Sequence, residues 1–550
     1  MSDIARLTVA ALEAHGFERL FCLPGVQNDD FFDALFDAQD RLPPIVARHE
    51  QACSYMAAGA EQASGRPQAY CVVPGQGVLN AAAGHSVAHA LGARVLALIG
   101  QIPTGMIGRG FGALHEIEDQ TAALRTISKR IEAVRGSEGA VEAMARAMRA
   151  VTSGRPGTAV LEVPATEWAK PIDWNAAALQ GEVEVVPLPE AQLDAAAAAL
   201  ARAQRPVILA GGGARDASPA LTALAEALGA PVSGGLNGKG AIDARHPLWL
   251  ELPAMHRLWP EADVALGVGT RLLPLGEWGV DEALTTVLLS ADPEAAGRVG
   301  ADLPVVALAE EALPALIERV QALRGGPADW GGRIVEERGR LADDLETVAP
   351  QMDYIRALRG ALGEDGVLVE DLTQVGFTAR YAYPTYRPRT YLSSGYSGAL
   401  GWAYPAALGA KTALPGARVV SIQGDGGFMY ASNEIATAVH HGIDAVAVVF
   451  DDGAYGNVKR IQQERFGHNR TIASDLTNPD FAAFARSFGA LGLEADGPAA
   501  LGEALEEAFA AERPTVIRVP VRTPMASPWP FIFLRGGRGA AGPLRRDSLL

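Results

Sequence analysis

Acidic side chains follow two neighbouring apolar runs in the C-terminal third of the chain. The run ARVVSIQ leads into GDGG, which contains Asp425, and the run DAVAVVF leads into Asp451 and Asp452. Parallel strands joined by a helix end at the same edge of a sheet, so these carboxylates are expected to lie side by side. Carboxylates beside glycine-rich turns suit Mg²⁺ bound together with a phosphate group. The alternative is that Asp425 caps a helix and the Asp-Asp-Gly sequence forms an ordinary turn.

A parallel sheet is needed to bring these acids side by side, and the chain has the alternating pattern that predicts such a sheet. Strand-like runs alternate with helical segments throughout, which is typical of α/β proteins. Between the two acidic sites, SNEIATAVHHG has helical spacing, with a cap at Ser432 or Asn433 and a stop at Gly442. Breaks rich in Pro, Gly and Glu divide the alternation into three blocks. The fold class is therefore predicted as α/β, with three doubly wound parallel-sheet domains at residues 1–170, 188–325 and 350–522.

A tail at residues 523–550 follows the third block. It loses the alternation and is rich in Pro, Gly and Arg, so we expect it to be extended or partly disordered. Trp529, Phe531 and Phe533 stand at alternate positions and form an apolar strip. This strip either covers a site and excludes water, or packs on its own domain or on a neighbouring subunit.

The composition and net charge of the chain limit the classes of function that it can have. The chain has 550 residues and a formal net charge of −17, which argues against nucleic acid as a partner. Its three cysteines show no CxxC spacing, so neither a zinc site nor a disulfide framework is expected. No apolar run is long enough to span a membrane, and the N-terminus does not resemble a signal peptide. A soluble cytoplasmic protein without membrane contact is the default expectation.

The acidic segment resembles the thiamin-diphosphate (ThDP) motif, GDG followed one β-α-β unit later by NN. The resemblance assigns Mg²⁺ to the side chains of Asp425 and Asp452 and to the backbone carbonyl of Ala454. It assigns further cofactor contacts to Gly426, Gly427, Tyr455 and Gly456. This chain departs from the motif because both asparagines are acids. Asp452 still offers an oxygen ligand, whereas the resemblance gives Asp451 no role.

A second motif supplies the other end of the cofactor. In IVARHEQACSYMAAGAEQ, Glu50 begins a helix of small residues. Taken alone, Glu50 is an acid in the first turn of a helix, favoured there by the helix dipole. The segment resembles the RHEQ region of the acetolactate synthase, benzoylformate decarboxylase and benzaldehyde lyase superfamily, where the matching Glu activates ThDP. A carboxyl group in an apolar slot can hold the proton that this activation needs.

The resemblance covers nearly the whole chain. In SGALGWAYPAALGAK, Leu400 matches the apolar residue that bends the cofactor into a V, and in EDLTQVG, Thr373 and Gln374 match a loop that contacts the diphosphate. The two motifs lie in different domains, and the superfamily pairs them across subunits. The resemblance therefore implies a homodimer or a homotetramer.

The resemblance also implies the chemistry, which is C–C bond cleavage or formation next to the carbonyl of a 2-oxo acid or 2-hydroxy ketone. Gln27 stands where some lyases carry a histidine, Val73 where benzoylformate decarboxylase carries one, and His115 where synthases carry a glutamine. We treat Gln27 and His115 as candidate catalytic residues, with a purely structural role for His115 as the alternative. Few proton donors favour an acetolactate-synthase-like carboligase, with a decarboxylase or a lyase as the alternative. FAD is not expected, because the central block lacks the synthase FAD pattern.

Two remote alternatives remain open. A nicotinamide oxidoreductase would use the glycines of AGGGARDAS or GVGTRL, neither of which completes GxGxxG. A non-catalytic relative would bind the cofactor without turnover, but retention of Glu50, Asp425 and Asp452 argues against this.

Overall fold

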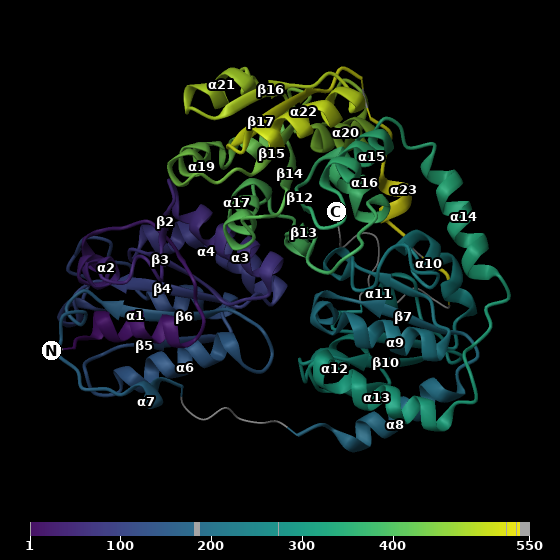
Figure 1. The fold of residues 1–550 in the computed structure, drawn as a ribbon, viewed down its shortest axis with the longest axis horizontal. Coiled ribbons are helices and arrows are strands. Elements are labelled where there is room, and N and C mark those ends of the chain that lie inside the picture. The colour runs from purple at the N-terminus through teal and green to yellow at the C-terminus, as the bar shows by residue number, and fades with distance from the viewer. Residues whose placement is uncertain (1, 181–186, 273, 524, 535, 539–550) are drawn as a thin grey trace.

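The computed structural model describes residues 2–180, 187–272, 274–523, 525–534 and 536–538. It contains three parallel sheets of six, five and six strands, with helices packed on their faces. In Figure 1 the N-terminal domain lies at the lower left, the central domain at the lower right and the C-terminal domain above them. The α/β class with three parallel-sheet domains, as predicted, is confirmed.

The N-terminal domain has the strand order β2-β1-β3-β4-β6-β5. Its strands are β1 (Leu20–Cys22), β2 (Pro44–Val46), β3 (Gln68–Val72), β4 (Val95–Gln101), β5 (Arg130–Ala133) and β6 (Ala159–Pro164). Its helices are α1 (Ile4–Ala14), α2 (Asp29–Phe36), α3 (Glu50–Ser64), α4 (Gln76–Leu91), α5 (Gln120–Leu124), α6 (Ala140–Thr152) and α7 (Ala176–Gln180). Strands β3, β4 and β6 are buried along their whole length, as expected for a sheet covered on both faces.

The central domain has the order β11-β10-β9-β7-β8. Its strands are β7 (Pro206–Ala210), β8 (Val232–Gly234), β9 (Val264–Val268), β10 (Thr285–Leu289) and β11 (Leu303–Val305). Its helices are α8 (Glu190–Arg202), α9 (Ser218–Leu228), α10 (Leu252–Leu258), α11 (Pro274–Glu277), α12 (Ala295–Val299) and α13 (Ala309–Leu323), and α14 (Arg333–Leu345) runs along the outer edge toward the next domain.

The C-terminal domain repeats the topology of the N-terminal one, with the order β13-β12-β14-β15-β17-β16. Its strands are β12 (Val367–Glu370), β13 (Tyr391–Ser393), β14 (Val419–Gly424), β15 (Val446–Asp451), β16 (Leu491–Glu494) and β17 (Thr515–Pro520). Its helices are α15 (Gln351–Leu362), α16 (Gln374–Ala382), α17 (Ala403–Ala413), α18 (Asp425–Met429), α19 (Ile435–His441), α20 (Gly456–Phe466), α21 (Phe481–Ser487) and α22 (Pro498–Ala511), with α23 (Trp529–Ile532) in the tail. In both domains the strand order reverses at the first strand, which is where ligands bind in sheets of this kind.

Helices α3 and α17 join the two six-stranded domains at very close range. A Cβ atom on Gly59 would lie 2.2 Å from the carbonyl oxygen of Ala406, and one on Gly409 would lie 1.9 Å from that of Met56. Only glycine at these two positions lets the helix backbones approach so closely. The small residues that the sequence concentrates in both helices therefore serve this contact.

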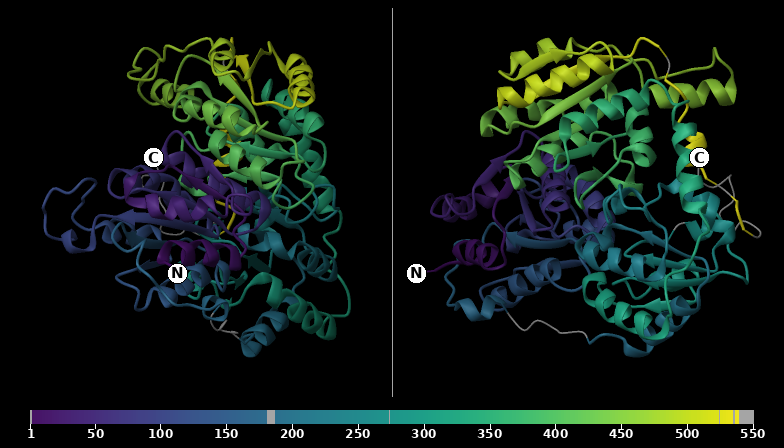
Figure 2. Two further views of the ribbon diagram at one scale, coloured as in Figure 1. Left: turned by 60° about the vertical axis from the view of Figure 1, so that its left-hand side comes forward. Right: turned by 45° about the vertical axis from the view of Figure 1, so that its right-hand side comes forward.

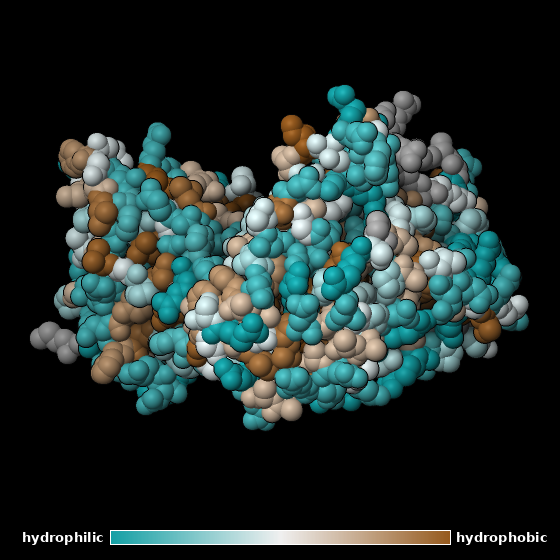
Figure 3. Space-filling view, turned by 90° about the horizontal axis from the view of Figure 1, so that it is seen from above, coloured by the Kyte–Doolittle hydropathy of each residue, from teal (hydrophilic) through white to brown (hydrophobic). Residues whose placement is uncertain are grey.

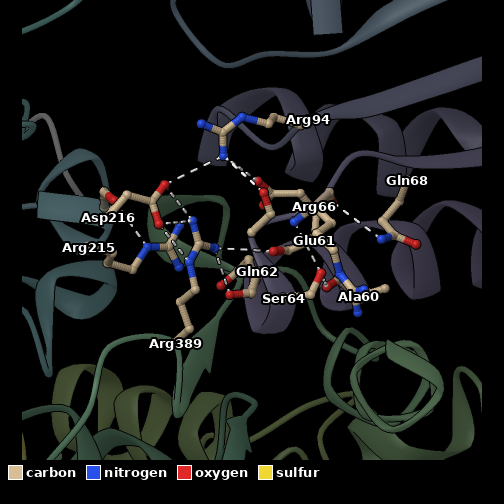
Figure 4. A network of polar contacts seen from close by, with 12 residues as sticks. Ala60, Glu61, Gln62, Ser64, Arg66, Gln68, Arg94, Arg215, Asp216 and Arg389 are labelled. Atoms are coloured by element: carbon tan, nitrogen blue, oxygen red, sulfur yellow. Dashed lines mark hydrogen bonds and ion pairs between the residues drawn. The ribbon is translucent and has the colours of Figure 1, made fainter. Parts of the chain in front are cut away.

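An ionic network holds all three domains together (Figure 4). Arg389, before β13, forms an ion pair with Asp216 of the central domain at 2.8 Å and donates to the carbonyl of Glu61 at 3.2 Å. Arg94 lies 3.6 Å from both Glu61 and Asp216. Arg389 has a positive φ of 65°, an uncommon backbone state for a residue other than glycine. The end of α3 is thus tied to both other domains.

The surface is mostly hydrophilic. Seen from above, hydrophilic side chains cover most of the molecule, and apolar ones gather in patches among them (Figure 3). None of the helices in the described part of the chain is long and apolar enough to cross a bilayer.

Candidate functional site

The two acidic sites meet at the carboxyl edge of the C-terminal sheet. Strands β14 and β15 are parallel neighbours, with Gly424 opposite Phe450, so Asp425 and Asp452 follow adjacent strand ends. The sequence predicted a turn after Gly424 and a helix from Ser432. Instead, α18 begins at Asp425 itself, a 3₁₀ turn covers Ser432–Glu434, and α19 follows. Gly442 ends α19 with φ 62°, in agreement with the predicted stop.

Asp425 is buried, whereas Asp452 beside it is exposed at the surface of the single chain, and the two carboxylates repel each other. Burial raises the pKa of Asp425, and partial desolvation together with the charge of Asp425 raises the pKa of Asp452 to about 6. Such a pair of oxygen donors fits a divalent cation, which would remove the repulsion. Across the residues that the structure describes, no three His, Cys, Asp or Glu side chains form a metal cluster, so a further protein ligand here would be another kind of group, such as a backbone carbonyl.

The backbone at Ala454 is oriented for such a ligand. Ala454 and Asp475 form an isolated antiparallel bridge, in which Tyr455 N–H donates to Ser474 O and Leu476 N–H to Gly453 O, both at 2.7 Å. In such a bridge the N–H and C=O of Ala454 both point away from the partner segment. Its N–H donates to Asp452 Oδ1 at 3.2 Å, so its carbonyl faces the Asp452 side as well.

Asp451 lies next to this pair but faces other partners. Arg518 Nε on β17 donates to Asp451 Oδ2 at 2.7 Å. Asn478 Nδ2 donates to Asp451 Oδ1 at 2.8 Å and to Asp425 Oδ2 at 2.6 Å. The sequence analysis missed Asn478 and Arg518, since neither stands within a recognisable motif.

Two glycines of the motif lie where no side chain fits. A Cβ on Gly426 would lie 2.5 Å from the ring of Tyr455, and one on Gly456 would lie 2.1 Å from Asp452 Oδ2. Gly427 faces Leu400, whose Cδ1 is 3.4 Å from the position of such a Cβ. The structure therefore brings Leu400 together with the residues of the GDG and DDG segments.

The loop after β12 lies at the same edge. Thr373 caps α16, and Gln374 is its first residue and accepts a hydrogen bond from Arg460 Nη1 on α20 at 3.1 Å. Asp371, which the sequence analysis did not single out, accepts from Gly401 N–H at 3.0 Å and so fixes the turn after Leu400. Burial raises the pKa of Asp371 to about 7. An acid directly after a buried strand was the signal that could have identified it.

Glu50 lies at the carboxyl edge of the N-terminal sheet, as the first residue of α3. Its Oε2 accepts a hydrogen bond from Asn80 Nδ2 at 3.1 Å, and its Oε1 lies 3.7 Å from the position of a Cβ on Gly77. Val73 packs directly between Gly25 and Gly77, since a Cβ on either would lie within 2.7 Å of it. The first turn of α4 thus packs against the carboxyl group of Glu50.

Gln27 and His115 meet above the same edge. Gln27 Nε2 donates to the carbonyl of Leu114 at 3.3 Å, and the buried Gln27 Oε1 and His115 Nδ1 have no hydrogen-bond partner within the described chain. The carbonyl oxygen of His115 lies 2.3 Å from the position of a Cβ on Gly75, so only glycine fits there. His115 has a positive φ of 69°, which is uncommon and marks a constrained backbone.

A buried hydrogen-bond network that the sequence analysis missed supports both the turn before α4 and the segment that carries His115. Gln120 Oε1 accepts from Gly75 N–H at 2.9 Å, and its Nε2 donates to Gly100 O at 2.8 Å and to Glu162 Oε2 at 3.0 Å. Glu162 is fully buried and also binds Gln101 and Arg135. Gln120 thereby joins the turn before α4 to the segment that follows His115.

The tail does not form a strand-like strip. Trp529–Ile532 form the short helix α23, in which Trp529 packs on Phe377 and Phe531 stacks on Tyr381, both of α16. Arg538 inserts into the central domain and donates to the carbonyls of Pro260 and Ala262. The described part of the tail therefore packs within its own chain, while residues 524, 535 and 539–550 lie outside the described residues.

Comparison with known proteins agrees with this geometry. Residues 2–123 match the N-terminal TPP-binding domain of thiamine pyrophosphate enzymes, residues 193–316 the central domain, and residues 371–519 the C-terminal TPP-binding domain. A probable acetolactate synthase large subunit of Methanocaldococcus jannaschii is 32% identical over 95% of this chain and 93% of its own length. A probable 2-ketoarginine decarboxylase of Pseudomonas aeruginosa is 31% identical over 88% and 87%, and an acetolactate synthase of Bacillus subtilis is 28% identical over 94% and 93%.

Three domain matches in the expected order, and a 32% identical relative that aligns over 95% of the chain, point to one family. The chain belongs to the thiamin-diphosphate-dependent enzymes and resembles the acetolactate synthase large subunits among them.

Proposed function

We propose that this enzyme is an acetolactate-synthase-like carboligase that uses ThDP and Mg²⁺. Its substrates would be a 2-oxo acid or a 2-hydroxy ketone and a second carbonyl compound. The observation that carries the proposal is the meeting of Asp425, Asp452 and the Ala454 backbone at one sheet edge, in a chain that also keeps Glu50. The acetolactate synthase relatives support carboligation over other outcomes.

In this proposal Asp425, Asp452 and the Ala454 carbonyl hold Mg²⁺, and Gly426, Gly427, Tyr455, Gly456, Thr373 and Gln374 surround the diphosphate. Leu400 supports the bend of the cofactor. When bound, ThDP supplies a carbanion that adds to a carbonyl and stabilises the charge left after C–C cleavage. Glu50 would hold a proton on the pyrimidine ring, and Asn80 keeps the Glu50 carboxyl in place.

Gln27 and His115 are proposed to face the substrate. Gln27 Nε2 donates to Leu114 O, so the Oε1 of the same amide is left as a hydrogen-bond acceptor without a partner in the described chain. It therefore suits a hydroxyl group at the reacting carbon. His115 Nδ1 would supply or receive a proton there.

A homodimer or homotetramer is part of the proposal. The contacts of Glu50 and those of Asp425 lie in separate domains, and no described contact joins the two groups within one chain. Apolar side chains are exposed beside both halves: Val26, Leu79, Phe111 and Leu114 near Glu50, and Met429, Tyr430 and Val458 near Asp425. Figure 2 (left) shows a loop in the colour of residues near 110 projecting from the body, as a segment that contacts a second copy would. A second copy would cover these side chains and bring the halves together.

FAD is not part of the proposal. The reason is the sequence of the central block, which lacks the FAD pattern of the synthases.

The test is incubation of the purified enzyme with ThDP, Mg²⁺ and a panel of 2-oxo acids, with and without aldehydes. Carboligation predicts an acyloin or a 2-hydroxy-3-oxo acid as the product, whereas release of the aldehyde alone would identify the decarboxylase that the Pseudomonas relative favours. Glu50→Gln should abolish turnover and the circular-dichroism band of the iminopyrimidine form of bound ThDP. An unchanged band and unchanged turnover in this variant would refute the role of Glu50.

A further inference from the structure

We propose that Asn478 and Arg518 together compensate for the acid that stands at position 451 in place of an amide. Asn478 is a positioning residue that orients Asp425 toward the metal, and Arg518 balances the additional charge of Asp451. This inference rests on the proposed Mg²⁺–ThDP site.

The first argument is the position of the Asn478 amide. A side-chain amide nitrogen carries two hydrogens, and here one reaches Asp425 Oδ2 at 2.6 Å and the other Asp451 Oδ1 at 2.8 Å. A single amide thus separates two carboxylates that would otherwise repel each other. Because Asn478 contacts Oδ2 of Asp425, Oδ1 is the less occupied oxygen of this carboxylate for a cation.

The second argument is the charge on Asp451. Its side chain is only 8% exposed, so an unpaired negative charge there would be costly. Strands β15 and β17 are parallel neighbours, with Val449 opposite Arg518, and this register directs the guanidinium to Asp451 Oδ2 at 2.7 Å. Both carboxylate oxygens of Asp451 therefore accept hydrogen bonds, from Arg518 and Asn478, which leaves Asp425 and Asp452 as the two carboxylate ligands of the metal.

The third argument is that one loop controls two ligands. Residues 472–478 pair with the Ala454 segment through Ser474 O and Leu476 N–H, both at 2.7 Å, and end at Asn478. The same loop thus fixes the direction of the Ala454 carbonyl and the direction of the Asp425 carboxylate. A displacement of this loop would disturb two of the three proposed ligands at once.

The experiment measures binding, so it does not depend on knowing the substrate. Isothermal titration of Mg²⁺ into the protein saturated with ThDP is carried out for the wild type, Asn478→Ala, Asp451→Asn and the double variant. Asn478→Ala should weaken Mg²⁺ binding by about 10- to 100-fold, the value of a lost hydrogen bond to a carboxylate. The matched control is Asn433→Ala, which removes an amide that donates to the Glu434 carboxylate at 3.1 Å but touches neither the loop 472–478 nor a carboxylate of the site, and it should bind Mg²⁺ within about twofold of the wild type.

The double variant tests whether the two amides are interchangeable. In Asp451→Asn/Asn478→Ala the amide at position 451 can donate to Asp425, so Mg²⁺ should bind at least about tenfold more tightly than to Asn478→Ala alone. Additive losses in the double variant would overturn the inference, as would unchanged Mg²⁺ binding in Asn478→Ala. Should Asn478→Ala melt abnormally, Asn478→Leu keeps the approximate volume, lacks the donor, adds no charge and must show the same loss. If the wild type itself bound no ThDP with Mg²⁺, the proposed function would fail rather than this inference.

Discussion

Gln120 allows a sharp test of how the Glu50 half of the site is held. The change is Gln120→Leu, which keeps the approximate volume and removes every hydrogen bond of a side chain that is 1% exposed. The bonds lost are those to Gly75 N–H, Gly100 O and the Glu162 carboxylate. With about 1 kcal/mol for each neutral bond and about 2 kcal/mol for the charged one, the expected cost is about 4 kcal/mol.

Gln101→Leu is the matched control. Gln101 is also buried, donates to the same Glu162 oxygen at 3.1 Å and accepts from Ile102 N–H at 2.8 Å, so its loss should cost about 3 kcal/mol on the same scale. It does not contact Gly75. The two variants therefore differ little in stability and differ in what they do to the turn before α4.

The functional readout separates them. Without the Gln120 contact, the first turn of α4 loses its anchor, and Asn80 and the His115 backbone shift relative to Glu50. We expect Gln120→Leu to lower kcat by about tenfold or more with KM little changed, because small misplacements of catalytic groups are costly. Gln101→Leu should keep kcat within about twofold of the wild type. Urea unfolding gives the stability, and steady-state kinetics with the iminopyrimidine circular-dichroism band gives the function; equal losses of kcat in both variants would refute the reasoning.

Two further predictions concern stability. Burial lowers the pKa of His85 to about 3, so the unfolded chain binds the extra proton first. This part of the stability is complete above the ordinary pKa of 6.5 and is lost as pH falls toward 3, with a loss of about 1 kcal/mol at pH 5.5. Urea midpoints at pH 7.5 and 5.5 should therefore differ less in His85→Asn than in the wild type. Gly59→Ala should destabilise the protein by about 1–3 kcal/mol, because the new Cβ meets the backbone of Ala406. The control is Gly360→Ala in α15, because the new Cβ there meets nothing within 4 Å. Thermal melting should show this variant to be as stable as the wild type or more stable. A greater loss of stability at Gly360 than at Gly59 would contradict the argument.

The sequence predicted the sheets and the strand-end acids because both follow from short-range patterns. An apolar run of strand length followed by Gly-Asp-Gly fixes where β14 ends, and parallel pairing then brings Asp425 beside Asp452. The same kind of pattern placed Glu50 at the start of a helix that follows a short strand, but its role as a candidate came only from the resemblance to the RHEQ region.

The supporting residues could not be predicted, because their positions depend on tertiary register. Arg518 reaches Asp451 only because β17 pairs with β15 in one particular alignment. Asn478 lies in a loop with no regular structure, and Gln120 meets Gly75 only after the segment from β4 to α5 has folded back. The alternation of aromatic residues in the tail predicted a strip, but two prolines flank Trp529 and a short helix forms there instead.

The charges around the proposed metal site explain how Asp451 and Asp452 can both stand in place of the asparagines of the ThDP motif. Asp425, Asp451 and Asp452 contribute three negative charges when ionised, Arg518 contributes one positive charge, and a divalent cation would contribute two, so the group would be neutral when the metal is bound. A motif with amides at both positions would keep a net positive charge with the same metal and would attract the diphosphate more strongly. The amide of Asn478 therefore separates the acids without adding charge, and the affinity for the diphosphate must come largely from direct coordination and from backbone N–H groups at glycines such as Gly426, where a side chain does not fit.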